Sequence, residues 1–166
     1  SDHTLARRCR FATSRLKVES WDGQIAHDAG LSGLAERVVE ILTHVAATLP
    51  QAWQNIVTKT DAHQWIHERS AESEVFTIRL PANGEIIGFL LIHVEAGPMP
   101  ERLRLHIGYF LSESNWGQGL GGELVDGLVQ WCNAAGDITE LVGGVEPANI
   151  ASAKILTRNG FQRADG

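Results

Sequence analysis

The sequence contains no long apolar run and only two cysteines. No stretch approaches the roughly 18 consecutive apolar residues that a membrane-spanning helix needs, and no apolar segment of a secretory signal follows the basic start SDHTLARRCRF. Cys9 and Cys132 are too few and too far apart for a disulfide scaffold or a Cys-x-x-Cys metal site. These absences predict a cytoplasmic protein with no membrane partner and with reduced thiols.

An excess of positive charge is also lacking, because 20 acidic residues outnumber 14 lysines and arginines and give a formal net charge of −6. A surface that neutralises a nucleic-acid backbone would be basic, so no nucleic-acid partner is expected and a cationic partner suits the chain better. Arg7, Arg8 and Arg10 form one local basic cluster, which we expect to be a solvated tail.

The length predicts a single domain over residues 1–166, because a chain of this size that is 43% hydrophobic can bury one core. Apolar residues recur at helical spacing from Gly33 until Pro50. A second helix is expected near Asp61, which is the candidate cap of its first turn. Phe11 to Trp21 alternates in part and predicts a first strand.

Three further segments predict an antiparallel meander. EVFTIRL and IIGFLLIHVEA are joined by PANGE, which is typical of a hairpin, and the alternating RLRLHIGYFL follows them. The first strand is expected to pair at the edge of this meander.

The character of the chain changes after Leu111. SESNWGQGLGG leads into a helix with apolar residues in steps of four, four and three, ending at Trp131, which we expect in the core. ITELVGGV then predicts a strand, and PANIASAKILTRNGF a last helix that ends at Gly160. A strand, helix and strand in this order imply one parallel pair. The predicted class is therefore α/β, with a mixed, mostly antiparallel central sheet flanked by helices.

Four glycines lie in NWGQGLGGE, residues 115–123. Bare backbone suits a turn that needs positive φ, or a place where helix amides meet an anion. If Gln118, Gly119, Gly121 and Gly122 begin the helix, their amides can face a phosphate with no Cβ in the way.

Three phosphate motifs compete for these glycines. Glu123 follows Gly122, which excludes a Walker sequence. Gly117, Gly119 and Gly122 match the dinucleotide pattern GxGxxG, but SESNW separates them from the strand, and fewer than about 50 residues remain to complete a dinucleotide fold.

The third pattern fits best. IGYFL, NWGQGLGGEL, the pair Asn149 and Ser152, and the NGF that begins at Asn159 together resemble the Gcn5-related N-acetyltransferase (GNAT) family, in its RimJ/RimL-like branch of ribosomal-protein alanine acetyltransferases. The pyrophosphate motif of that family, Arg/Gln-x-x-Gly-x-Gly/Ala, maps onto Trp116 to Gly121, and a tryptophan at its first position resembles the variant of this branch. The similarity extends from Phe11 to Phe161.

The resemblance implies a splayed pair of parallel strands, residues 103–111 and 138–145, that receives acetyl-CoA as the cosubstrate. Backbone groups would bind the pantetheine and the diphosphate without a metal, and Asn149 would bind the pantetheine. The implied cofactor-binding residues are Tyr109, Phe110, Leu111, Trp116, Gln118, Gly119, Gly121, Gly122 and Asn149.

The resemblance also implies that Ser152 lies near the thioester sulfur and donates a proton to the departing thiolate. The structural alternatives are an N-cap role for Asn149 and an ordinary helical position for Ser152. Many relatives place a tyrosine acid where this chain has Leu156, so either Ser152 or water must act instead. Glu113 and His106 are the candidate bases. Glu113 as a solvated loop carboxylate and His106 on an exposed face are the alternatives.

The implied reaction is acetyl transfer to a primary amine, either a protein N-terminal α-amine or a small cationic amine, with Trp21 and Trp53 as candidates to line the acceptor pocket. A non-catalytic CoA-binding sensor domain and a nicotinamide-binding fragment are the rivals. The family usually adds two strands after the last helix, whereas this sequence stops at FQRADG. The alternatives are a fragment, a disordered further tail, or a partner that completes the sheet. A homodimer is a separate candidate assembly.

His63 and His67 are spaced like metal ligands on a helix, but no third ligand accompanies them. We therefore expect no metal.

Overall fold

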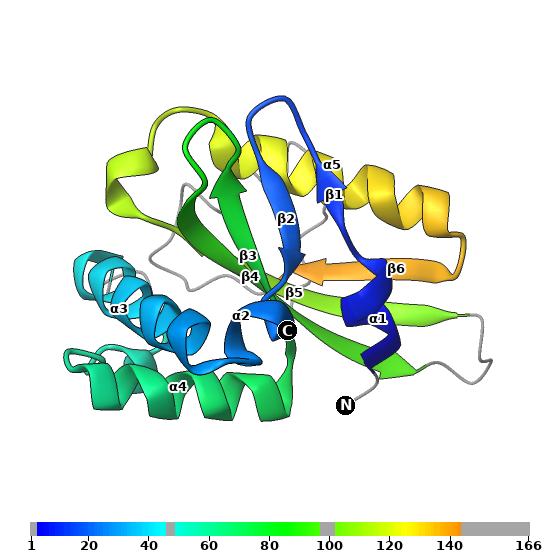
Figure 1. The fold of residues 1–166 in the computed structure, drawn as a ribbon. Helices are drawn as coiled ribbons and strands as arrows, with labels where there is room; N and C mark the ends of the chain where they lie inside the picture. Colours follow the sequence, from blue (N-terminus) through cyan, green and yellow to red (C-terminus); the bar gives the residue numbers. More distant parts are fainter. Residues whose placement is uncertain (1–2, 46–48, 97–101, 144–166) are drawn as a thin grey trace.

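A six-stranded sheet forms the centre of the computed structural model, which describes residues 3–45, 49–96 and 102–143 (Figure 1). All neighbouring strands are antiparallel except the last pair, which is parallel. This confirms the mixed, mostly antiparallel sheet expected from the sequence. In sheet order, which is also chain order, the strands are β1 (Phe11–Ala12), β2 (Lys17–Ser20), β3 (Glu74–Leu80), β4 (Glu85–Ala96), β5 (Leu103–Leu111) and β6 (Ile138–Gly143).

Helices cover both faces of the sheet. Figure 1 shows α3 and α4 side by side, on the side of the sheet away from α5. The helices are α1 (His3–Arg8), α2 (Asp22–Ile25), α3 (Asp28–Val45), α4 (Lys59–Glu72) and α5 (Leu120–Ala135), with short 3₁₀ helices η2 (Gln51–Trp53) and η3 (Glu113–Asn115) before α4 and α5.

Strand β5 contributes to both halves of the core because its side chains alternate between the faces. Leu105 and Ile107 pack with Leu124 and Leu128 of α5 on one face. Phe110 packs on the other face, among the side chains of α3 and α4. Both helical layers thus pack against β5, and this packing holds the end of the strand from which the next loop begins.

Five aromatic rings lie together on the side of α3 and α4. Ring centroids are 5.5 Å apart between Trp53 and Trp65, and 6.3 Å apart between Trp53 and Phe110. Trp21 contacts Trp65 and Phe89 edge to face and is only 1% exposed, so the expectation that it lines an acceptor pocket is wrong. Its packing in the core explains why it cannot reach a ligand.

Residues 11–21 form a hairpin instead of the single strand expected. Strands β1 and β2 pair with each other, and β2 pairs with β3 at the edge of the meander. The reversal between them is closed by bonds from Thr13: its N–H donates to the Leu16 carbonyl at 2.9 Å, and its Oγ1 accepts from the Leu16 N–H at 3.1 Å. Threonine in such a turn competes with extended pairing, which a period-two pattern does not reveal.

Two helix starts differ from the sequence expectation. Helix α3 begins at Asp28, ahead of Gly33, and His27 Nδ1 accepts from the Gly30 N–H in its first turn. Helix α4 is capped by Thr58, whose side chain accepts from the Asp61 N–H, while the Asp61 carboxylate accepts from the Thr58 N–H. Asp61 thus completes a capping box and is not the N-cap itself.

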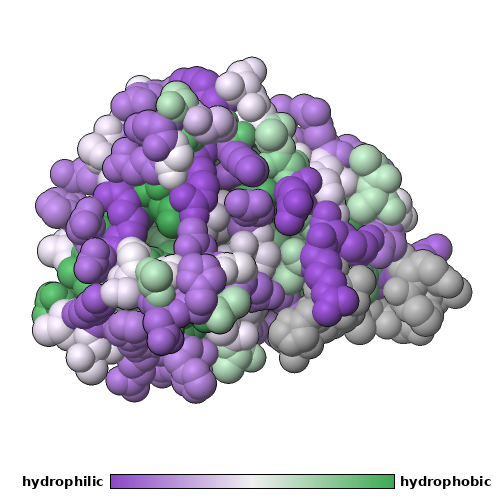
Figure 2. Space-filling view, viewed as in Figure 1, coloured by the Kyte–Doolittle hydropathy of each residue, from purple (hydrophilic) through white to green (hydrophobic). Residues whose placement is uncertain are grey.

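The basic cluster near the amino terminus is also not a free tail. Arg7 and Arg8 end helix α1, and Arg8 forms an ion pair with Asp137 at 3.0 Å. Arg10 lies 3.8 Å from Glu19. Figure 2 shows a mostly hydrophilic surface on this side of the molecule, with apolar patches interspersed. No helix among the described residues is both long enough and apolar enough to span a membrane.

Candidate functional site

The segment between β5 and α5 consists of η3 followed by a glycine turn. Gly117 and Gly119 have φ angles of +74° and +77°, which residues with a Cβ rarely adopt. Gly119 is the N-cap of α5, and no side chain in the described part of the chain caps the first turn of the helix. An uncapped amino end of this kind presents free N–H groups and a partial positive charge.

Gly122 leaves the surface of this helix end open. A Cβ added there would meet no atom within 4 Å among the described residues, whereas Gly121 is buried. The two interpretations of the glycines therefore apply to different positions: Gly117 and Gly119 serve the turn, and Gly122 leaves the backbone open to an approaching group. This arrangement fits an anion that binds main-chain amides.

Three residues that the sequence did not single out as a group surround the same helix end. Glu123 lies in the first turn of α5, and its carboxylate accepts from Thr13 Oγ1, from the Arg15 main-chain N–H at 2.8 Å and from Arg15 Nε at 2.8 Å. Arg15 Nη1 also donates to the Gln118 carbonyl at 2.9 Å. The turn between β1 and β2 is thereby attached to the glycine loop.

Partial burial raises the pKa of the Glu123 carboxyl. Hydrogen bonds from Thr13 and from the Arg15 main chain and side chain, together with the charge of Arg15, lower this pKa by more than burial raises it. The net effect is a pKa below the usual value of 4.5. Glu123 is therefore negative at neutral pH, and Arg15 is the positive charge that faces it.

Trp116 attaches the loop to the end of β5. Its indole Nε1 donates to the Leu111 carbonyl at 2.9 Å, although the side chain is 46% exposed. Gln118 Nε2 donates to the Ser114 carbonyl at 3.3 Å. The sequence-predicted residues of the loop are thus brought together at one end of β5.

The end of β5 extends past its described pairing with β6. The parallel ladder between the two strands ends at Ile107 and Gly143, so Tyr109, Phe110 and Leu111 lie beyond it. Tyr109 and Leu111 pack on the face covered by α5, and Phe110 on the opposite face. The three residues predicted to bind pantetheine therefore lie between the ladder and the glycine loop.

The candidate bases differ in their surroundings. Glu113 is exposed at the start of η3, and its carboxylate has no hydrogen-bond or ion-pair partner within the described part of the chain. His106 Nε2 lies 3.3 Å from Glu95 Oε1, and the neighbouring Arg104 forms ion pairs with Glu95 and Glu140. His106 therefore belongs to a partly exposed charged group on the sheet.

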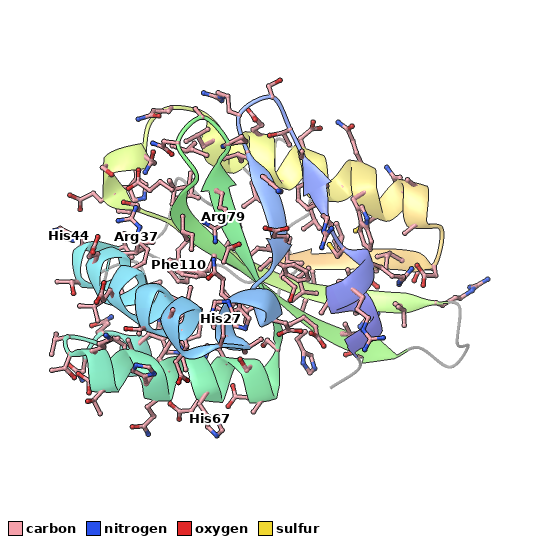
Figure 3. The ribbon with its side chains drawn as sticks, viewed as in Figure 1. His27, Arg37, His44, His67, Arg79 and Phe110 are labelled. Carbon is pink, nitrogen blue, oxygen red and sulfur yellow. The ribbon has the colours of Figure 1, made fainter. Side chains whose placement is uncertain are left out.

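The remaining candidates do not form a site within the described ranges. Asn149, Ser152 and Leu156 lie outside the described residues, so their roles stay predictions. His67 projects from the outer side of α4 (Figure 3), and no group of three or more His, Cys, Asp or Glu side chains suited to a metal occurs in the parts of the chain that the structure describes.

The described residues form a mixed α/β sheet with one parallel pair, and a glycine turn and the helix α5 connect the two strands of that pair. Residues 26–162 match the acetyltransferase (GNAT) domain, which covers most of the chain. The chain therefore belongs to the GNAT family of N-acetyltransferases.

Solved structures share this fold at low sequence identity. A GNAT-family acetyltransferase from Bacillus anthracis superposes with a TM-score of 0.72 at 14% identity, covering 95% of this chain and 86% of that one. RimL, the ribosomal L7/L12 α-N-protein acetyltransferase solved with coenzyme A, gives 0.68 at 20% identity, with 90% and 81% covered. Mycobacterium smegmatis RimJ, solved with a CoA disulfide, gives 0.68 at 19% identity, with 90% and 71% covered.

One curated relative is similar in sequence over part of its length. The uncharacterized N-acetyltransferase p20 of Bacillus licheniformis is 32% identical over 108 residues, which are 62% of this chain and 57% of that protein. The match spans little more than half of the relative. It supports the family and leaves the acceptor open.

Proposed function

We propose that the chain binds acetyl-CoA at the amino end of α5 and transfers the acetyl group to a primary amine, either a protein N-terminal α-amine or a small cationic amine. The observation that carries this proposal is the first turn of α5, which follows the glycine turn after β5 and has neither a described capping side chain nor described atoms over Gly122. RimL and RimJ, which share the fold, were solved with CoA and a CoA disulfide, which supports the same ligand for this chain.

The described residues fit this cosubstrate. Main-chain amides of Gln118, Gly119, Gly121 and Gly122 would hold the diphosphate, and the positive end of the helix dipole removes the need for a metal. A side chain at Gly122 would occupy open space that a phosphate could use. Asn149 is the proposed side-chain ligand of the pantetheine.

The pantetheine would lie along the backbone of Tyr109, Phe110 and Leu111. The Leu111 carbonyl is already bound by the indole of Trp116, so that group serves the loop. Trp116 thus attaches the start of the glycine motif to the strand that would hold the thioester.

The chemical step is direct attack of the amine. The amine nitrogen bonds to the thioester carbonyl carbon, the carbon–sulfur bond breaks, and the sulfur leaves with the bonding electrons as a thiolate. The nitrogen gives up one proton to a base, and the thiolate takes one from Ser152 or from water. A main-chain N–H near Phe110 or Leu111 would stabilise the oxyanion.

Glu113 is the proposed base. It begins η3 directly after β5, and no described side chain competes for its carboxylate. The imidazole of His106, in contrast, lies beside Glu95, within β5 and before the end of the strand. Glu113 is therefore the better placed of the two to receive a proton from the amine, directly or through water.

Calorimetry with acetyl-CoA at high protein concentration tests the binding, and CoA release from a panel of peptides and small amines tests the transfer. We expect both. No binding of acetyl-CoA would overturn the proposal. Tight binding without release from any amine would favour the sensor-domain alternative, and protection of the glycine loop from proteolysis by NAD but not by CoA would favour the nicotinamide alternative.

A further inference from the structure

Arg15 lies at the amino end of α5 although it precedes Glu123 by 108 residues. The turn between β1 and β2 carries it there, and three separate donors of this one residue bind the loop and the helix. The main-chain N–H and Nε donate to the two Glu123 carboxylate oxygens, and Nη1 donates to the Gln118 carbonyl. The sequence gives no local sign of this contact.

Both acceptors are groups that would otherwise oppose a phosphate at this position. The Glu123 carboxylate is a negative charge within the first turn of α5, and the Gln118 carbonyl carries the negative end of a peptide dipole. Arg15 neutralises the first and binds the second. With both groups held by Arg15, less negative charge opposes an anion that approaches the amides of the helix end.

The Arg15 guanidinium also has N–H groups that no described acceptor uses. A guanidinium has five N–H groups, and the contacts with described residues use Nε and one N–H of Nη1. Nη2 lies 3.6 Å from the position that a Cβ on Gly119 would take, and the side chain is 48% exposed. The guanidinium therefore borders the place proposed for the diphosphate and is open to solvent there.

We infer that Arg15 is a positioning residue for the CoA diphosphate: it holds the Gln118 carbonyl, cancels the charge of Glu123, and presents Nη2 beside Gly119. This inference rests on the proposed function, because it needs a phosphate-bearing ligand at the amino end of α5. It adds a residue outside the glycine motif to the binding of that ligand.

The test compares Arg15→Gln with Arg8→Gln. Arg8 is a matched control because it is also a partly exposed arginine in an ion pair, with Asp137 at 3.0 Å beyond the other end of α5. We expect Arg15→Gln to weaken acetyl-CoA binding in calorimetry by about 10-fold to 100-fold, the usual range for losing charged hydrogen bonds, and Arg8→Gln to leave it unchanged. Arg15→Lys should lie between, because lysine keeps the charge without the planar fork.

Binding of S-acetylpantetheine distinguishes a role of Arg15 at the diphosphate from a general loosening of the loop. This compound has the thioester and arm of acetyl-CoA without the diphosphate. Ligand-detected NMR reaches its weaker affinity, and we expect Arg15→Gln to bind it as well as the wild type does. Adding Glu123→Gln to Arg15→Gln should recover part of the lost acetyl-CoA affinity, because the uncompensated charge is then removed.

Three results would overturn the inference: equal acetyl-CoA affinity of Arg15→Gln and Arg8→Gln, equal losses for acetyl-CoA and S-acetylpantetheine, or no recovery in the double variant. Urea unfolding of each variant checks that the fold is kept, and Arg15→Lys supplies a folded variant if glutamine disrupts it. A wild-type protein that fails to bind acetyl-CoA would overturn the proposed function together with this inference. Failure of the variants alone would leave the proposed function standing.

Discussion

Gly122 and Gly119 are three residues apart in the same loop, but a side chain at each would meet different surroundings. At Gly119 the backbone has φ of +77°, and an added Cβ would lie near Arg15. At Gly122 the backbone is helical, and no atom of the residues that the structure describes would lie within 4 Å of an added Cβ. Gly121 is buried, so a variant there tests packing as well as the ligand. Gly122 is therefore the position at which a substitution probes the ligand alone.

Gly122→Ala should weaken acetyl-CoA binding at least about 10-fold without destabilising the fold, because its methyl group stands where a phosphate oxygen would come within about 3 Å of an amide. The helix itself should gain up to about 1 kcal/mol. Calorimetry and urea unfolding measure the two effects. Gly33→Ala in α3, where an added Cβ also meets no described atom within 4 Å, is the control and should leave binding unchanged. Unchanged affinity in Gly122→Ala would place the diphosphate elsewhere.

Glu123 should make the stability of the fold depend on acidity. Its pKa is lower in the folded chain than in the unfolded one, so its stabilising bonds to Thr13 and Arg15 are fully present above the usual value of 4.5 and are lost as the pH falls through the lowered value. The difference in unfolding free energy between wild type and Glu123→Gln should thus be largest near pH 7 and shrink below about pH 4.5. Urea titrations at several pH values measure it, and a difference independent of pH would contradict the assignment.

At the scale of elements, β4 and β5 leave no room for a side chain at Gly88. A Cβ on Gly88 of β4 would lie 2.3 Å from the Phe110 carbonyl oxygen and 2.9 Å from a Leu111 side-chain carbon. These are the strand residues next to the loop. The glycine therefore lets β4 approach the part of β5 that the proposed thioester site needs.

Gly88→Ala should destabilise the fold by about 1–3 kcal/mol, the usual cost of forcing extra atoms into a packed contact. Gly108→Ala on the adjacent strand β5 is the control, because a Cβ there meets no atom within 4 Å among the described residues, and it should be nearly neutral. Urea unfolding measures the free energy of unfolding of both variants. Equal stability of the two would mean that the strands separate without cost.

The elements that the sequence predicted are those with a local pattern. Strands β3 and β4 are apolar runs joined by a hairpin sequence, β5 alternates, and α5 repeats apolar residues every three or four positions, so local pattern was enough for all four. The hairpin of β1 and β2 was missed because its break depends on two hydrogen bonds of Thr13. Helix α1 was missed because its six residues carry no helical repeat.

The same contrast holds within the site. The glycine loop could be predicted because the strand before it and the helix after it are visible in the sequence. Arg15 could not, since the two partners of its ion pair are 108 residues apart and only the folded sheet brings them together. Asn149 and Ser152 lie outside the described residues, so the catalytic half of the site still depends on resemblance.

At the scale of the whole molecule, both thiols belong to the core between α5 and the sheet. Cys9 is fully buried and Cys132 is 4% exposed. Burial raises the pKa of each thiol to about 12, and the neighbouring Cys132 adds to the shift at Cys9 while Asp137 adds to it at Cys132. Neither thiol is an available nucleophile near neutral pH, because only the thiolate reacts.

Ellman's reagent should accordingly titrate no protein thiol in the native state and both in urea. The rate of labelling at intermediate urea should follow global unfolding, since the core must open to expose them. Rapid reaction of either thiol in the native protein at pH 7 would contradict their burial. Because the buried thiols do not react, the reagent also reports released CoA without a background from the enzyme.

The order of the strands has a consequence for how the chain folds. Each strand in the sheet lies beside its neighbour in the sequence, and β1 with β2, β3 with β4 and β4 with β5 are separated by few residues, so these pairs can form at little cost in chain entropy. Helices α2, α3 and α4 lie between β2 and β3, and α5 lies between β5 and β6. The contact of Arg15 with Glu123 is the opposite, because it closes a loop of 108 residues. We expect the sheet to form early and the glycine loop to gain its electrostatic partner late. A nascent chain would then acquire its scaffold before it acquires its affinity for the cosubstrate.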